Sequence, residues 1–327
     1  NHLDILSIRW LETFLLEYQG CALVISHDQR FLEAIATHIL DVDYGTVELY
    51  TGGYEAFALE KRATRERKEA EIARAQKIIA DKRAFVDRFG AKASKAKQAQ
   101  SRLKQIEKIE VEELVESSRA APLFQFPIER QSGKDVLELT GVTKAYGDKR
   151  VLKGVSLVIR RGEKVAILGA NGLGKSTLLK IAVKRLGADA GEARWGYEAR
   201  HGYFAQDHGD LLTDPKATPL ALMKSACPTE AEFVVRGRLG RVLFSGGDVN
   251  KRISTLSGGE AARLVFARIM AEKANVLVLD EPTNHLDMES IEPLTEGLKA
   301  YEGTLLFVSH DRAFVSALAT RIVAVTE

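Results

Sequence analysis

The sequence predicts an α/β fold for residues 135–327, preceded by a long helical segment and by a partial second copy of the same module. From Asp135 onwards, apolar strand-like runs alternate with helical patterns, which is typical of a sheet covered by helices. Residues 59–117 contain no proline and are rich in Ala, Glu, Lys, Arg and Gln, which favours long helices. Residues 18–40 match residues 301–323 without a gap, which indicates an internal repeat.

The repeat and the changes in composition divide the chain into four segments. We expect the C-terminal remnant of a first module, a basic helical-hairpin linker, a connector and a complete second module at residues 1–58, 59–117, 118–134 and 135–327. Within the remnant, the run GTVELYTGGYEAF predicts a β-hairpin around glycine-containing turns. The NHLD of residues 1–4 returns within EPTNHLD at residues 281–287, so we expect that the chain begins inside the first module.

The linker is predicted to be a pair of antiparallel helices. Ile72, Ile79 and Val86 repeat every seven residues and leave a narrow apolar seam against a partner helix. Residues 89–100 interrupt this seam, and we expect the tip of the hairpin near residues 90–97. Residues 60–110 contain 16 Lys and Arg against 8 Asp and Glu, although the whole chain carries a net charge of only +2. Such an element indicates either a contact with a polyanion or a solvated charged coiled coil.

The composition narrows the class of protein. An apolar fraction of 45% over 327 residues allows more than one packed core. No apolar run approaches the ~20 residues that span a bilayer, and the N-terminus lacks the pattern of a signal peptide. Cys21 and Cys227 lack the spacing of metal ligands and are typical of thiols in a reducing compartment. We therefore expect a cytoplasmic protein with no membrane partner.

A phosphate-binding loop is predicted after the apolar run KVAIL. The segment GANGLGKS has the spacing G-x-x-x-x-G-K-S, and a helical pattern follows it. In such a loop, backbone N–H groups face the phosphates and the helix N-terminus adds partial positive charge. Lys175 is expected to reach the outer phosphates, and the Ser176 hydroxyl is expected to bind Mg²⁺. The predicted nucleotide-binding residues of the loop are Gly169, Ala170, Asn171, Gly172, Leu173, Gly174, Lys175, Ser176 and Thr177.

Two carboxylates end the apolar run ANVLVLDEP. A continuously apolar strand predicts burial on both faces, and it places Asp280 and Glu281 at the carboxyl edge of the sheet, where ligands bind. Asp280 is expected to hold magnesium, and Glu281 is expected to polarise the attacking water. The alternative is an acidic pair that only caps a neighbouring helix.

A second glycine-rich segment, within STLSGGEAARLVFARIM, begins a strong helical pattern. Ser257, Gly258, Gly259 and Glu260 form a helix start that can bind an anion. One phosphate loop serves one nucleotide, so this segment is expected to contact a second nucleotide or one held by a partner. A Ser-Gly-Gly segment alone is more often a plain turn, and the order of the motifs is what indicates function.

In this order of motifs, residues 135–327 resemble the nucleotide-binding domain of the ABC ATPases, which has a P-loop NTPase fold. Residues 1–44 resemble the end of a second such domain. The resemblance implies ATP and Mg²⁺ as ligands. It also implies that Tyr146 stacks on the base, of ATP or GTP alike, and that Gln206 contacts magnesium and the attacking water. Taken singly, a tyrosine after a strand is more often a packing residue.

The same resemblance implies two further roles in each repeat. Asp287 is similar to the residue that crosses the interface between two domains, and His310 is similar to the histidine that contacts the terminal phosphate. Asp4 and His27 occupy the matching positions of the first repeat. A lone histidine at a strand end is otherwise an ordinary surface or core residue.

The chain resembles more narrowly the ABC-F family, whose members carry two such domains separated by a basic helical linker. VSHDRAFV, the repeated NHLD and the linker after YTGGYEAFALEKR carry this resemblance, and FGAKASKAKQAQSR, SSRAAPLFQF, LGRVLFSGGDV and NHLDMESIEPL are similar to the bacterial YbiT-type subgroup. The family implies an ATP-hydrolysing translation factor on the ribosome, whose linker reaches ribosomal RNA and the peptidyl-site transfer RNA. The expected RNA contacts, to backbone and shape rather than to base sequence, are Arg88, Lys92, Lys95, Lys97, Arg102 and Lys104.

ABC ATPases bind two nucleotides between two head-to-tail domains, each site combining one domain's phosphate loop with the other's Ser-Gly-Gly. This sequence has one of each, both in the second repeat, so neither composite site is complete. We therefore expect impaired hydrolysis by the chain alone. Its missing partner is a first ABC domain or a second copy in a head-to-tail homodimer.

Three other classes are weighed against the translation factor. The ATPase subunit of a membrane transporter has no need of the basic hairpin. A DNA-repair or chromosome-organising ATPase typically inserts zinc-binding cysteines or far longer coiled coils. A binding scaffold with an inactive site is opposed by Lys175, Asp280, Glu281 and His310.

Overall fold

The computed structural model describes residues 5–26, 28–43, 46–89, 121–207, 214 and 216–326. The chain forms two compact units, one of residues 1–31 with 121–327 and one of residues 32–120. The predicted tip of the linker and its second helix lie outside the described residues.

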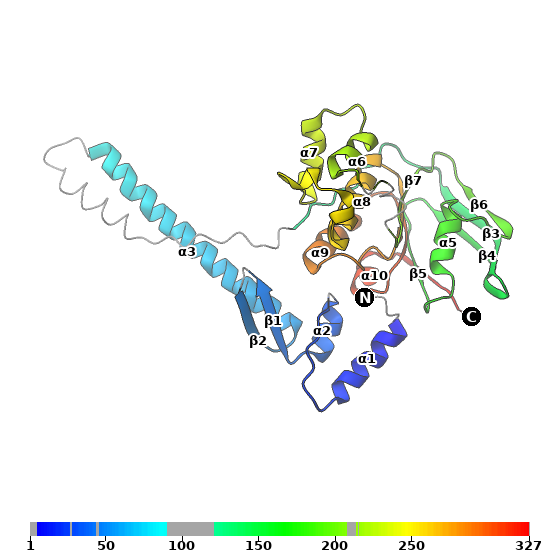
Figure 1. Ribbon diagram of the computed structural model, residues 1–327, viewed down its shortest axis with the longest axis horizontal. Coiled ribbons are helices and arrows are strands. Elements are labelled where there is room, and N and C mark those ends of the chain that lie inside the picture. The colour runs from blue at the N-terminus through cyan, green and yellow to red at the C-terminus, as the bar shows by residue number, and fades with distance from the viewer. Residues whose placement is uncertain are drawn as a thin grey trace. The chain divides into compact units, whose positions relative to one another are not determined.

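The smaller unit contains an antiparallel hairpin followed by a long helix (Figure 1). Strand β1 (His38–Asp43) pairs along its whole length with β2 (Thr46–Thr51). The sequence predicted the strand at β2, but it placed the whole hairpin between residues 45 and 57. This placement was wrong, because the first strand lies upstream and residues 54–57 are helical.

Helix α3 (Tyr54–Phe89) begins just after the hairpin. Gly52 has a φ of +111°, a conformation that favours glycine and ends the strand. The backbone N–H of Glu55 then donates to the Glu33 carboxylate at 2.8 Å, which satisfies one of the free donors at the helix start. The structure thus confirms a long helix in the first half of the predicted linker.

The larger unit is built on a five-stranded parallel sheet in the order β10-β5-β9-β8-β7. Every residue of β8 and β9 is buried, as expected for continuously apolar strands covered on both faces. This arrangement confirms the predicted α/β fold. The strands are β5 (Lys164–Leu168), β7 (His201–Phe204), β8 (Val276–Asp280), β9 (Thr304–Val308) and β10 (Arg321–Ala324).

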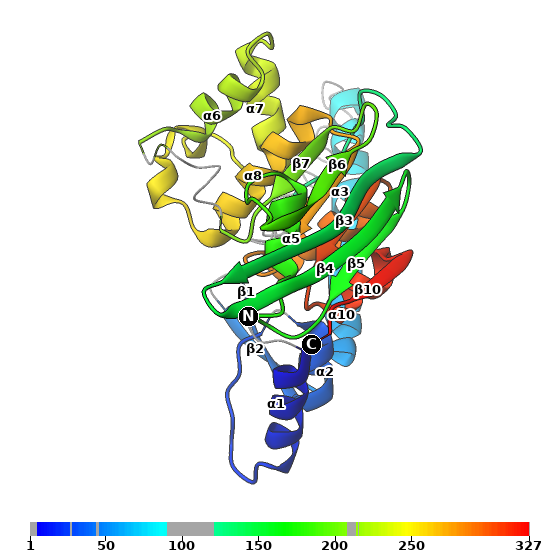
Figure 2. The ribbon, with the colours of Figure 1, turned by 90° about the vertical axis from the view of Figure 1, so that its right-hand side faces the viewer.

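A three-stranded antiparallel sheet packs on this unit in the order β4-β3-β6. Figure 2 shows its long strands in front of helix α5 (Lys175–Ala182). Buried residues of the antiparallel sheet, of α5 and of the parallel strands form one core, as with Leu139, Leu178 and Val278. The strands are β3 (Asp135–Tyr146), β4 (Lys149–Arg160) and β6 (Ala190–Trp195).

The remaining helices of this unit surround a second core that contains Phe204, Phe266 and Phe307. Figure 1 shows α6, α7 and α8 as a group on the other side of the unit from the antiparallel strands. They are α6 (Pro219–Ala226), α7 (Glu232–Arg241), α8 (Gly258–Glu272), α9 (Met288–Lys299) and α10 (Arg312–Leu318). Two helices nearer the N-terminus, α1 (Ile5–Glu17) and α2 (Gln29–Ile35), contribute no described residue to this core.

The predicted connector forms part of this second core. Along residues 121–126, exposed and buried side chains alternate, and Pro122, Phe124 and Phe126 are buried. The rings of Phe124 and Phe126 pack edge-on against Phe266 of α8, with centroids 5.3 and 6.2 Å away. We call residues 121–129 the strap, because they lie across the helices as an extended segment.

No helix among the described residues is long and apolar enough to cross a membrane.

Candidate nucleotide-binding site

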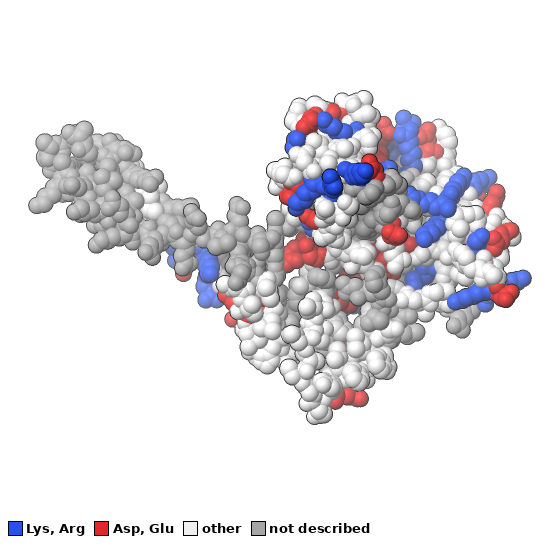
Figure 3. Space-filling model, in the orientation of Figure 1, with Lys and Arg blue, Asp and Glu red and all other residues white. Residues whose placement is uncertain are grey.

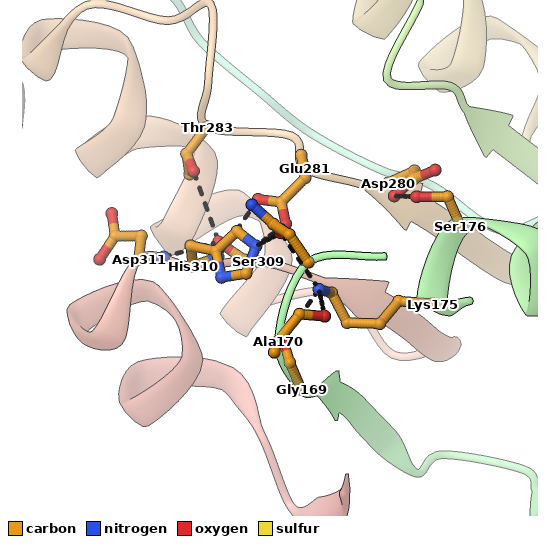
Figure 4. A network of polar contacts seen from close by, with 11 residues as sticks. Gly169, Ala170, Lys175, Ser176, Asp280, Glu281, Thr283, Ser309, His310 and Asp311 are labelled. Carbon is orange, nitrogen blue, oxygen red and sulfur yellow. Dashed lines mark hydrogen bonds and ion pairs between the residues drawn. The ribbon is translucent and has the colours of Figure 1, made fainter. Parts of the chain in front are cut away.

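The phosphate loop connects β5 to α5. Gly174, which precedes α5, has a φ of +93°, and a Cβ there would lie 2.4 Å from a side-chain carbon of Val151. Both the backbone conformation and the space therefore require glycine. The Lys175 side chain is buried, and its Nζ donates to the carbonyl oxygens of Gly169 at 2.8 Å and Ala170 at 2.9 Å (Figure 4). The loop thus holds its lysine against its own backbone.

Asp280 and Ser176 meet at the end of β8 (Figure 4). The Ser176 hydroxyl donates to Oδ1 of Asp280 at 3.0 Å. The other oxygen, Oδ2, is buried and has no hydrogen-bond partner among the described residues. Burial raises the pKa of Asp280, and the hydrogen bond from Ser176 lowers it in part.

These two residues fit a magnesium ion. Mg²⁺ prefers oxygen ligands and usually takes one or two carboxylates together with substrate phosphates. A hydroxyl and a buried carboxylate oxygen without a partner offer such ligands, whereas the described residues hold no cluster of three or more His, Cys, Asp or Glu for a metal.

Glu281 follows Asp280 directly, and both of its carboxylate oxygens lie close to His310. Its φ of +51° is uncommon for a residue other than glycine. Its Oε2 accepts from the backbone N–H of His310 at 3.2 Å, and its Oε1 lies 3.2 Å from Nε2 of the same histidine. Burial, together with the nearby charge of Asp280, raises the pKa of Glu281 to about 7.

His310 also approaches the phosphate loop. Its Nε2 lies 3.0 Å from the side-chain oxygen of Asn171. The histidine follows β9, Glu281 follows β8 and Asn171 follows β5, which are neighbouring strands of one parallel sheet. The carboxyl ends of these strands therefore bring the three side chains to one edge.

A cavity of about 600 Å³ lies at this edge. It is lined by the predicted base-stacking residue, by six of the nine residues predicted for the phosphate loop and by the predicted groups around the attacking water. Gly169, Ala170, Leu173 and Asp280 are not among its lining residues. The lining residues are Tyr146, Lys149, Val151, Asn171, Gly172, Gly174, Lys175, Ser176, Thr177, Gln206, Glu281, Asn284 and His310. The sequence did not predict Lys149, Val151 or Asn284 as site residues. A signal for Lys149 existed, because the Gly-Asp pair between Tyr146 and Lys149 is typical of a two-residue hairpin turn.

The Ser-Gly-Gly segment does not line this cavity. Ser257 caps α8 reciprocally: its Oγ accepts from the N–H of Glu260 at 3.2 Å, while its own N–H donates to the Glu260 carboxylate at 2.8 Å. A Cβ on Gly258 or Gly259 would lie against His285, at 3.5 and 3.2 Å from its nearest atoms. In the same region, Arg263 lies 3.7 Å from the carboxylate of Asp287. The predicted signature and the predicted interface aspartate thus lie together, apart from the phosphate loop.

The predicted RNA contact Arg88 lies in α3. The other predicted site residues that fall outside the described residues are Asp4, His27, Lys92, Lys95, Lys97, Arg102 and Lys104.

Family models agree with this architecture. A model described as ABC transporter matches residues 152–284, and a second with the same description matches residues 40–126. Among solved structures, the chain is similar to the dimeric bacterial ABC transporter cassette MJ0796, with a TM-score of 0.51 and 25% identity over 58% of this chain and 94% of that chain.

Relatives extend over the whole chain. It is 45% identical to the probable ATP-binding protein YbiT of Escherichia coli O157:H7, over 100% of this chain and 62% of the relative. It is 40% identical to the uncharacterized ABC transporter ATP-binding protein YkpA of Bacillus subtilis, over 100% of this chain and 61% of the relative. It is 36% identical to ABC transporter F family member 5 of Arabidopsis thaliana, over 100% of this chain and 47% of the relative. The chain therefore spans about 62% or less of the length of these relatives.

The fold and the phosphate loop define a P-loop ATPase cassette. The chain belongs to the ABC family of ATP-binding proteins, and its relatives confirm the resemblance to the ABC-F family.

Proposed function

We propose that the chain binds Mg·ATP in the 600 Å³ cavity and that, within a pair of cassettes, it hydrolyses ATP as an ABC-F translation factor on the ribosome. The observation that carries the proposal is the convergence of the phosphate loop, Glu281 and His310 on one cavity, with Asp280 hydrogen-bonded to Ser176 of its lining. The family relationship and the basic excess of residues 60–110 support the ribosome as partner and the cytoplasm as location.

The residues divide the chemistry among them. Lys175 and the loop N–H groups bind the phosphates, and Tyr146 stacks on the base. Ser176 and Asp280 would hold Mg²⁺ together with Gln206, which lines the same cavity. The ion, when bound, neutralises phosphate charge. Glu281 in its ionised form accepts a hydrogen bond from the attacking water and orients it. His310 holds the Glu281 carboxylate through its backbone N–H.

Completion of each site from a second cassette accounts for the position of Ser257 and Asp287 outside the cavity. In the head-to-tail arrangement of the family, these residues face the nucleotide of the partner domain. We therefore propose that a chain on its own hydrolyses ATP more slowly than a pair of cassettes.

The RNA contact is assigned to the linker rather than to the cassette. On the face of the larger unit drawn in Figure 3, the described Lys and Arg side chains are interspersed with Asp and Glu. Such a surface gives little attraction for a polyanion. Residues 88–106 contain six basic residues and no acidic one. The proposed contacts remain Arg88, Lys92, Lys95, Lys97, Arg102 and Lys104.

Co-sedimentation with ribosomes tests the proposal. The protein studied carries this chain together with a first cassette, with Glu281→Gln and its equivalent in that cassette to slow hydrolysis. We expect pelleting that requires ATP and that weakens when Lys92, Lys95 and Lys97 are neutralised, since each lost phosphate contact changes the log–log salt slope by roughly 0.7–0.9. Failure to pellet at moderate salt despite measured ATP binding would remove the ribosome from the proposal.

The second candidate is the ATPase subunit of a membrane transporter. It is favoured by the description of both family models and by the likeness to a transporter cassette. Under this alternative, the protein would co-purify with membranes through a membrane subunit, and neutralising the linker lysines would leave its partner binding unchanged.

A further inference from the structure

The hairpin between β3 and β4 places two side chains next to each other. The turn consists of Gly147 and Asp148, and Gly147 has a φ of +57°, as tight hairpin turns require. Tyr146 and Lys149 are direct partners across the two strands. Residues directly opposite in an antiparallel pair project from the same face. A nucleotide base that stacks on Tyr146 therefore lies close to the Lys149 side chain.

Lys149 also reaches the phosphate loop. It lines the same cavity as Asn171, Gly172 and Lys175. Its Nζ lies 3.8 Å from the position that a Cβ on Gly172 would occupy. Gly172 has a φ of +78° and no side chain, so the loop backbone is open toward this ammonium group.

Among the described residues, Lys149 has no carboxylate partner that would neutralise its charge. Lys144 on the adjacent strand forms an ion pair with Asp189 at 2.6 Å. Lys149 forms no ion pair with any described carboxylate, and its side chain is exposed. An exposed lysine with a free charge, at the open side of a phosphate loop, complements the polyphosphate of a nucleotide.

We propose that Lys149 is a further nucleotide-binding residue, which contacts the polyphosphate at the solvent side of the loop. The proposal rests on the proposed binding of ATP in this cavity. Lys175, at the start of α5, is buried and its ammonium group is held by loop carbonyls. Lys149, at the start of β4 in the antiparallel sheet, is exposed. The antiparallel hairpin thus contributes both the base-stacking tyrosine and one phosphate contact.

Equilibrium binding of ATP and ADP to the 327-residue chain tests this, in Mg²⁺ and at low and high salt. The variants are Lys149→Ala, Lys149→Arg, Lys153→Ala and Lys175→Ala. Lys153 is the matched control, because it is an exposed lysine of the same strand that does not line the cavity. Its removal lowers the positive charge of the strand by the same amount.

We expect Lys149→Ala to weaken ATP binding about two- to fivefold at low salt, the upper part of the range of an exposed charge pair. The loss should shrink at salt well above ~0.1 M, where the screening length falls below about 10 Å. Lys149→Arg should bind like the unchanged chain, and so should Lys153→Ala.

Equal affinities for the Lys149→Ala and Lys153→Ala chains would overturn the proposal, and so would a loss that is the same at both salt concentrations, because that would indicate packing of the hairpin. If Lys175→Ala bound ATP as tightly as the unchanged chain, the proposed nucleotide site itself would be wrong. The two failures are therefore distinguishable.

Discussion

At the scale of single residues, Glu281 combines three unfavourable features. Its backbone has a positive φ, its side chain is only 5% exposed, and its carboxylate lies close to Asp280. Burial and this neighbouring charge disfavour the ionised form, and they raise the pKa of Glu281 to about 7. The ionised form is the one that can orient an attacking water. The fold therefore holds this group at a cost in stability, as functional sites often do.

Glu281→Gln is expected to stabilise the chain when neither nucleotide nor metal is present. A carboxyl group with a raised pKa contributes its stability below its unfolded value of 4.5, and the contribution is lost as the pH rises through about 7. The amide has the same shape but does not ionise. At about pH 8 we expect a gain of up to ~2–3 kcal/mol, or roughly 5–10 °C in Tm. Near pH 5 the gain should be small.

Thermal unfolding in EDTA at both pH values measures this difference. Glu192→Gln, at an exposed glutamate of β6, controls for the removal of one negative charge. A Glu281→Gln chain that melts no higher than the unchanged chain at pH 8 would show that burial of Glu281 carries no such cost.

The site residues that could be predicted from the sequence were those in a short motif at the end of a predicted strand. Lys175 follows the loop after β5 and Asp280 ends β8, each within a short motif, so both lie at the carboxyl edge of one parallel sheet. The resemblance placed His310 at the terminal phosphate, whereas its contact with Asn171 joins distant parts of the chain and was not predicted. Lys149 was missed because its role depends on how the second sheet packs over the loop.

At the scale of elements, the strap connects the end of the linker to the helices of the cassette. The Leu123 N–H donates to the carbonyl of Arg241 at 2.7 Å, and the Glu129 N–H donates to that of Lys273 at 3.1 Å. The strap is thereby bonded to residues at the C-terminal ends of α7 and α8. α8 carries the Ser-Gly-Gly segment at its other end, so strap and signature share one rigid element.

Gly297→Ala is expected to destabilise the larger unit. A Cβ on Gly297 of α9 would lie 2.5 Å from the carbonyl oxygen of Phe124, and this backbone is held by the hydrogen bond from Leu123. Such overpacking typically costs about 1–3 kcal/mol. Alanine brings a gain of about 1 kcal/mol to a helix interior, which leaves a net cost of up to about 2 kcal/mol. We expect Tm to fall by up to about 4–8 °C, given 2–4 °C per kcal/mol for a unit of this size.

Gly237→Ala provides the control for this prediction. Gly237 lies inside α7, and a Cβ there has no neighbour within 4 Å. The same chemical change should therefore raise Tm slightly. If both variants raised Tm, the strap would not be fixed against α9.

The strap also shows what a local sequence pattern leaves open. Its two prolines and its position between predicted domains indicated a connector. The burial of Phe124 and Phe126 depends instead on their ring contacts with Phe266 of α8 and with Tyr301. The hairpin at residues 38–51 was misplaced for a similar reason. The run HILDVD shows little alternation, and its pairing with β2 decides that it is a strand.

At the scale of the whole molecule, the internal repeat shows that context determines structure. Residues 304–308 form the buried strand β9 between β5 and β8. The matching residues 21–25 pair with no strand in the described part of the chain, and Leu23 and Ile25 are 80% and 92% exposed. A strand of a parallel sheet depends on at least one neighbouring strand that pairs with its backbone groups. The division into domains predicted at residues 1–58 accordingly remains a proposal.

The same reasoning gives a prediction about association. The cavity contains a phosphate loop but no Ser-Gly-Gly segment, and the proposed function assigns that segment to a second cassette. The solved cassette to which the chain is similar is dimeric.

 Two copies of the chain arranged head to tail would place the Ser257 segment of each copy against the phosphate loop of the other. ATP between them would then favour the paired state, because both surfaces contact it.

We therefore expect the Glu281→Gln chain to form a dimer in Mg·ATP and to remain a monomer in ADP or without nucleotide. Sedimentation velocity at several protein concentrations measures this, with Lys175→Ala as the control that lacks the phosphate contact. Ser257→Ala should weaken the dimer without changing nucleotide binding to the monomer, since Ser257 does not line the cavity of its own chain. In the unchanged chain, the rate of hydrolysis per molecule should rise with concentration, because only paired molecules complete a site. A sedimentation coefficient that is independent of concentration in ATP would contradict this arrangement, and the second cassette would then have to be a different domain from the one described.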